Sequence, residues 1–317
     1  MSNLIILPQE NEYIDQDGVL RTTLPPGAIN LGYPGIDPRL REQLLHIRHA
    51  RNYMEDALQT GYLIMTPSGN FIFHTDLPAE SFVGFAIEAY VVRLLNNSMR
   101  LKRNSLLWCS RKMQVKDDFL SQFTAIGTGL LATKQNHINY FEPQSKLDVK
   151  FIRPRINKRT KEEYFDLLPQ EGTHIPAGIQ VKAITTNEKS EIVDKVLSGE
   201  YPHVLTCCWS SERGGGHTKD VCMTILKNML NSRLVRYDQY LRAVDAIKSP
   251  SELGFDQAEI DEYIQYLIAN YPKVLSPNEF TDVVATVEIT AQFSPQSVFS
   301  DNRKIVLPDQ MNFQIED

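Results

Sequence analysis

The sequence predicts an α/β fold in which a mixed β-sheet is flanked by helices, with further segments added at both ends of the chain. Two stretches carry this prediction. Residues 178–209, GIQVKAITTNEKSEIVDKVLSGEYPHVLTCCW, show the pattern of a strand, a helix and a second strand. Residues 146–156, KLDVKFIRPRI, alternate between apolar and polar side chains as a strand does. Longer segments with helical signals stand on both sides of these strands.

Composition limits the kind of protein that this chain can be. Hydrophobic residues make up 42% and charged residues 23% of the 317 residues, which is typical of a globular protein. The net charge of -6 argues against a protein that coats nucleic acid, so a nucleic-acid site would be a local patch. The four cysteines form no CxxC pair, which predicts neither a zinc site nor a disulfide framework and suits a reducing cytoplasm. Neither a signal peptide nor a membrane span is expected.

Residues 1–75 are predicted to form an N-terminal arm, a helix and a hairpin. The first 35 or so residues are rich in Pro, Gly and Asn and are expected to be irregular. A helix is predicted after them, with Asp37 as its cap, Pro38 in its first turn and Gly61 as its stop. Two short strands about a Pro-Ser-Gly-Asn turn follow in residues 62–75.

A core is predicted over residues 76–215, and it begins with a helix whose start signals are Asp76 and Pro78. Further along, strands are expected at 105–115 and 146–156, a mostly helical segment at 116–135, a short apolar segment at 164–169, and a loop at 210–216. Residues 216–317 are predicted to form a C-terminal region packed on the core, with helices at 217–247 and 251–272 and strands at 281–293 and 303–308.

The strand 178–184 has two different faces. Ile179, Val181 and Ala183 point to one side, and Gln180 and Lys182 point to the other. We therefore expect one face of the strand to pack against the core and the other to present polar side chains of a functional site. Thr185 and Glu188 have the spacing of a capping box for the next helix, which a buried, nearly continuous apolar strand follows. This order predicts a crossover between two parallel strands.

Two carboxylates upstream are expected to face Gln180 and Lys182. Asp166 lies in the apolar segment YFDLLP, where a carboxylate is costly without a partner, and a hairpin would bring it beside Gln180. Glu88 is the only acid in the helical run SFVGFAIEAYVVRLL and shares a face with Phe85 and Val92. Oxygen ligands suit Mg²⁺, and a lysine beside them can orient a water or neutralise charge on a phosphate. The set of residues suits phosphodiester hydrolysis.

The order Glu88, Asp166, Gln180-x-Lys182, helix and strand resembles the PD-(D/E)xK superfamily of restriction-endonuclease-like nucleases, over about residues 81–209. The resemblance implies a mixed sheet flanked by helices and catalytic roles for those four residues. It implies that Asp166, the Val181 carbonyl and Glu88 hold one Mg²⁺ or Mn²⁺ ion. Gln180 departs from the commonest pattern and matches the QxK branches, and no PD dipeptide precedes Asp166. The implied function is a metal-dependent DNA endonuclease in restriction, phage defence or repair, with a homodimer as one candidate assembly.

Several alternatives stand beside these expectations. Asp148, in KLDVKF, is a rival for the first acid. Gln180 and Lys182 would face solvent if the strand were half-exposed. A separate alternative for Glu88 is a structural salt bridge with Arg93 or Arg100. The basic run RPRINKRTK, residues 153–161, is either a solvated turn or a phosphate-contacting patch, and residues 212–220 are expected to be a flexible loop. At the level of function, the alternative is a non-catalytic DNA-binding or assembly protein on the same core.

Overall fold

The computed structural model describes residues 11–14, 20–23, 49, 52–53, 55–65, 71–73, 77–114, 116–211 and 216–274. The chain divides into two compact units, one made of residues 1–79 with 265–317 and the other of residues 80–264. The division of the sequence at residues 75 and 215 stays a prediction. The strands expected at 281–293 and 303–308, and most of the loop expected at 210–216, lie outside the described residues.

The first unit contains two short antiparallel hairpins. Strand β1 (Asn11–Ile14) pairs with β2 (Leu20–Thr23), and β3 (Leu63–Met65) pairs with β4 (Phe71–Phe73). Residues 55–60 are helical, and Gly61 ends that helix with a φ of 82°. The predicted helix stop and the strand pair after it are therefore confirmed.

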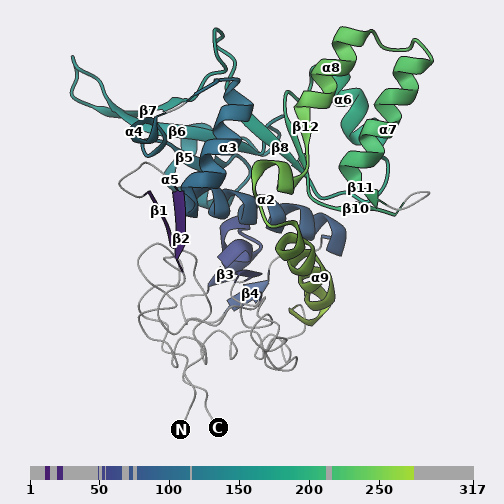
Figure 1. Cartoon of the computed structure of the whole chain (residues 1–317). Coiled ribbons are helices and arrows are strands. Elements are labelled where there is room, and N and C mark those ends of the chain that lie inside the picture. Colours follow the sequence, from purple (N-terminus) through teal and green to yellow (C-terminus); the bar gives the residue numbers. More distant parts are fainter. Residues whose placement is uncertain are drawn as a thin grey trace, which may run out of the picture. The chain divides into compact units, whose positions relative to one another are not determined.

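The second unit is built on one mixed sheet (Figure 1). Its path runs β12 (Ile247–Lys248), β9 (Val204–Thr206), β8 (Gly178–Lys182), β6 (Val149–Ile156) and β5 (Thr124–Gly127). Strands β5, β6 and β8 pair antiparallel, whereas β8, β9 and β12 are parallel. β7 (Glu163–Leu167) pairs with the C-terminal half of β6. The prediction of an α/β fold with a mixed sheet and a parallel crossover, here from β8 to β9, is confirmed.

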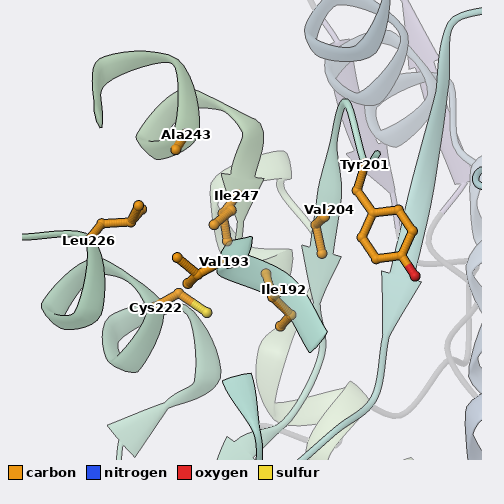
Figure 2. Packing of buried hydrophobic residues seen from close by; sticks show 8 residues of the cluster. All are labelled: Ile192, Val193, Tyr201, Val204, Cys222, Leu226, Ala243 and Ile247. Carbon is orange, nitrogen blue, oxygen red and sulfur yellow. The ribbon is translucent and has the colours of Figure 1, made fainter. Parts of the chain in front are cut away.

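Helices flank this sheet, and one group of them buries the face that carries Val204 (Figure 2). The crossover contains a π-helical turn, η2 (Lys189–Val193), followed by α6 (Asp194–Leu197). It packs with α7 (Thr218–Asn231) and α8 (Tyr237–Ala246). The hydrophobic cluster between them contains Ile192, Val193, Tyr201, Val204, Cys222, Leu226, Ala243 and Ile247. Residues 217–247 are helical over most of their length, as predicted.

The remaining helices complete the described part of the unit. α2 (Ala79–Asn97) follows the predicted start signals, α9 (Gln257–Val274) contains most of the helix expected near the C-terminus, and η3 (Pro250–Leu253) is a single 3-10 turn. Short elements connect β5 to its neighbours: α4 (Asp117–Leu120), α5 (Leu131–Asn136) and the 3-10 turn η1 (Ile138–Tyr140). Two residues, Trp209–Ser210 (β10), pair with Gly216–His217 (β11).

The hairpin of β1 and β2 lies in residues that were expected to be irregular, and two elements of the second unit also differ from the sequence prediction. Residues 105–110, expected in a strand, belong to the helix α3 (Met99–Ser110), which Ser98 caps by accepting a hydrogen bond from the Leu101 amide. Its buried residues recur with helical spacing, and a window starting at Ser105 hides that period. The helical segment expected at 116–135 instead contains β5, whose Ala125 amide and carbonyl are both bonded to the Asn96 side chain.

Candidate functional site: Asp148, Gln180, Lys182 and Glu88

Asp148 joins the start of β6 to β8. One carboxylate oxygen, Oδ2, accepts a hydrogen bond of 2.6 Å from Gln180 Nε2 and another of 2.8 Å from the Val181 amide. The side chain of Asp148 thus takes the place of a backbone acceptor at the point where the ladder between β6 and β8 ends. The carboxylate is held by two donors from the strand that carries the QxK motif.

The register of the two strands produces this contact. β6 pairs with β8 through Val149 opposite Ile179 and Lys150 opposite Gly178, so the next step places Asp148 beside Gln180 on the same face. A Cβ atom at Gly178 would collide with the Val149 carbonyl oxygen, so glycine allows the two backbones to approach here. The local sequence therefore fixes both the register and the distance between the strands.

Lys182 points to the same face, two residues beyond Gln180. Its ammonium lies 3.6 Å from a carboxylate oxygen of Glu191, in η2, and 5.2 Å from the centre of the Tyr201 ring. The Lys182 side chain is 16% exposed, so the ammonium is largely shielded from water but still accessible. Glu191 and Tyr201 were not predicted from the sequence, because both come from the crossover and only the fold brings them to Lys182.

The carboxyl groups of Glu88 and Asp148 lie in one electrostatic environment. Burial raises the pKa of Asp148 to about 6, although the Val181 amide, Lys182 and Gln180 each act to lower it. Burial also raises the pKa of Glu88 well above its ordinary range; the Asp148 carboxylate adds to this rise and Lys182 opposes it. The Lys182 charge therefore acts on both carboxyl groups, and the Asp148 carboxylate acts on Glu88.

Among the described residues, no ion pair joins Glu88 to Arg93 or Arg100, the two partners considered from the sequence. The guanidinium of Arg93 lies over the Tyr90 ring at 4.9 Å, and Arg100 donates a hydrogen bond to the Gly254 carbonyl. Gln180 is only 7% exposed, so the alternative of a polar strand face turned to solvent is wrong for this residue. The structure groups Glu88, Gln180 and Lys182 with Asp148.

The expectation that Asp166 is the first acid of this site is wrong. Asp166 lies opposite Arg153 in the β6–β7 ladder and pairs with Arg155 at 3.0 Å and Arg153 at 3.6 Å. Arg153 is five residues beyond Asp148, about 16 Å along the strand. An odd separation also places the two on opposite faces of the sheet, so Asp166 faces away from Gln180 and Lys182. Asp148, the rival that the sequence offered, is the acid that lies beside Gln180.

The donors around Asp148 fit a hard divalent cation. Gln180 Oε1 is buried and has no hydrogen-bond partner among the described residues, and an orphaned amide oxygen is a natural cation ligand. In a strand the carbonyl of a residue points to the same side as its amide, so the Val181 carbonyl is directed towards Asp148. Within the described residues no cluster of three or more His, Cys, Asp or Glu side chains is found, so Gln180 and a main-chain oxygen would supplement the carboxylates.

Comparisons with known protein families, with curated proteins and with solved structures found no match for this chain. Among the helices that the structure describes, none is both long enough and apolar enough to cross a bilayer. The four cysteines are buried, and Cys207 and Cys208 are core residues, as expected.

Proposed function

We propose that the chain is a metal-dependent nuclease that hydrolyses phosphodiester bonds in DNA, on a restriction-endonuclease-like core. The observation that carries the proposal is the Asp148 carboxylate, bonded to both Gln180 and the Val181 amide, with Lys182 next on the same face. Glu88, from the helix before the sheet, adds a second carboxyl group. This arrangement supports a D…QxK site in which Asp148 is the first acid. Restriction and phage defence are the settings that we propose.

Each residue has a role that its surroundings support. Asp148, Gln180 Oε1 and the Val181 carbonyl would hold Mg²⁺ or Mn²⁺, with Glu88 reached through water. A divalent cation bound there would lower the pKa of an attacking water and neutralise charge on the phosphate. The Lys182 ammonium donates hydrogen bonds to the water or to a phosphate oxygen, and Glu191 holds the ammonium until the substrate competes for it.

The ribbon formed by β6 and β7 supplies a surface for DNA (Figure 1). It extends away from the helices, and its tip, residues 157–161, carries Lys158, Arg159 and Lys161. Among the described residues none of these three cations forms a side-chain ion pair. A two-stranded ribbon fits the major groove, and exposed lysine and arginine contact phosphates. The basic run in the sequence is therefore proposed as the duplex-binding element.

Cleavage of plasmid and linear DNA with Mg²⁺ or Mn²⁺ tests the proposal. We expect Asp148→Asn and Lys182→Ala to lower the cleavage rate by roughly 10²–10³-fold, because each removes preorganised charge at the reacting phosphate. DNA affinity should change little, since duplex binding depends on many phosphate contacts. Asp166→Asn is the matched control for the chemical step: it removes the same group on the other face of the sheet, and although it frees Arg153 and Arg155 of the basic run to contact DNA, the rate at saturating DNA should be unchanged.

The alternative is a non-catalytic DNA-binding protein on the same core. Gln180 favours it, because glutamine contributes no charge to a cation site. Wild-type protein that binds DNA but cuts neither substrate with either metal would support this alternative. Cleavage that survives both Asp148→Asn and Lys182→Ala, in protein free of contaminating nuclease, would place the chemistry elsewhere.

A further inference from the structure

A second polar pocket contains none of the residues of the Asp148 site. It has a volume of about 780 Å³ and is bounded by the end of α3, the residue before β9, the end of α8 and η3. Val204 pairs with Gln180 and shares its face, so the adjacent His203, which lines the pocket, points to the opposite side. The volume is within the range of small-molecule sites, about 300–1,000 Å³.

The charges around this pocket are predominantly positive, although the chain carries a net charge of -6. Four of the lining residues are cations, namely Arg111, Lys112, Arg242 and Lys248, and two are acids, Asp245 and Glu252. Arg242 is bonded to Asp238 at the surface, and Glu252 is bonded to Lys219 and Ser249. Among the described residues no ion pair engages Arg111, Lys112 or Lys248. Three cations without an ion pair thus face one acid without one, and the Lys112 ammonium also lies 4.8 Å from the centre of the Phe119 ring.

The floor of the pocket is rigid and uncharged. Trp108 donates its indole N–H to the Asp245 carbonyl at 2.8 Å, and the His203 ring meets the Trp108 ring edge-on at 5.0 Å. Burial, together with the smaller effects of the Arg111 and Lys248 charges, lowers the pKa of His203 to about 3. The Lys248 ammonium lies 5.6 Å from the centre of the Trp108 ring. The positive field therefore converges on an aromatic, neutral floor.

Arg111 has a backbone conformation that is costly for an arginine. It follows the last residue of α3 with a φ of 58°, and its amide donates to the Trp108 carbonyl. A left-handed conformation costs a residue other than glycine about 1 kcal/mol, and glycine or asparagine would end the helix more cheaply. The cost is explained if the Arg111 guanidinium at the pocket rim binds a ligand.

We propose that this pocket binds a phosphate-bearing small molecule of mononucleotide size. Its phosphates would be held by Arg111, Lys112 and Lys248, and its apolar part would lie against Leu241 and the edge of Trp108. Leu241 is 47% exposed in the absence of such a ligand, and Trp108 is mostly buried. The site is separate from the Asp148 site, so the proposal does not depend on nuclease activity.

Tryptophan fluorescence provides a direct test, because the chain has two tryptophans and only Trp108 lines the pocket. In a Trp209→Phe background, pyrophosphate should change the Trp108 emission saturably, and calorimetry with ADP should give one site per chain. Arg111→Asn, which tolerates the left-handed backbone, and Lys248→Gln should each weaken binding by about tenfold, the loss expected for one charge-assisted hydrogen bond. Lys227→Gln, a matched charge change on the exposed side of α7, should have no effect.

Three results would overturn the proposal. The first is no saturable response of the wild-type chain to pyrophosphate or ADP up to about 5 mM. The second is equal weakening of binding by Lys227→Gln and Lys248→Gln. Binding of short DNA that depends on Arg111 and Lys248, with no response to pyrophosphate or ADP, would also overturn it and would assign the surface to nucleic acid. Melting temperatures of the variants show whether each is folded, and Lys112→Gln replaces any variant that is not.

Discussion

Asp148→Asn should make the folded protein more stable at high pH. Burial gives the Asp148 carboxyl a pKa of about 6 in place of 3.8, so its ionisation in the folded state is unfavourable. A shift of about 2 pKa units corresponds to about 3 kcal/mol. Asparagine can accept the bonds from Gln180 and Val181 with its remaining oxygen but never ionises. The variant should therefore exceed the wild type in the free energy of unfolding by up to about 3 kcal/mol at pH 8.

The sign of this effect sets its pH window. Because the folded pKa is above the unfolded one, the stability that proton binding contributes is complete below about pH 3.8 and is lost as the pH rises through about 6. The difference between variant and wild type should therefore be small at pH 4 and largest above pH 7. Glu88 acts in the same direction, since removal of the Asp148 charge also eases the ionisation of Glu88.

Urea unfolding followed by circular dichroism, in metal-free buffer at pH 4.5, 6 and 8, measures the difference. Asp166→Asn is the control, because the Asp166 carboxylate is half-exposed and its ion pairs contribute about 1 kcal/mol or less. Two results would refute the assignment of a buried carboxylate whose ionisation is unfavourable. One is an Asp148→Asn protein that is less stable than the wild type at pH 8, and the other is a difference in the free energy of unfolding that is the same at all three pH values.

Three further variants probe the sheet and the ribbon. Gln180→Glu places a carboxylate within hydrogen-bonding distance of Asp148, so the melting temperature at pH 8 should fall in EDTA and recover with Mn²⁺. Gly178→Ala presses a Cβ on the Val149 carbonyl and should cost about 2 kcal/mol or more in urea unfolding, whereas Gly84→Ala, in an open position of α2, should stabilise by up to about 1 kcal/mol. Replacing the three tip cations, Lys158, Arg159 and Lys161, by glutamine should lower the DNA affinity measured by fluorescence anisotropy. It should also reduce the slope of the logarithm of the binding constant against the logarithm of the salt concentration by about 3.

Local patterns in the sequence predicted much of the sheet. The alternation in residues 146–156 and 178–182 and the apolar run before Trp209 gave strands β6, β8 and β9, because burial of one or both faces leaves a period that can be read in a short window. Gly199, with a φ of 78°, ends the crossover helix, as is typical of glycine after a helix.

Pairing between distant segments could not be predicted in the same way. Placing Asp166 in the site assumed that β7 and β8 form a hairpin, but both pair with β6, and a bridge between Pro169 and Pro176 closes the loop between them. The predicted capping box also fails, because Asn187 adopts a left-handed φ of 62° and Glu188 turns inward, 1% exposed. These outcomes depend on the register and on a single backbone angle, which residue type alone does not determine.

Asp148 has two roles at one position. Its carboxylate belongs to the candidate site, and it also accepts the hydrogen bond of the Val181 amide. Alanine at 148 would remove a charge and would also leave a main-chain donor of β8 without its acceptor, at a cost of about 1–3 kcal/mol if water cannot reach it. An alanine scan would then mix loss of chemistry with loss of folding at this residue. Over evolutionary time, a descendant that had abandoned the chemistry would still be held to an oxygen-bearing side chain here, since drift to an apolar residue would loosen the sheet itself.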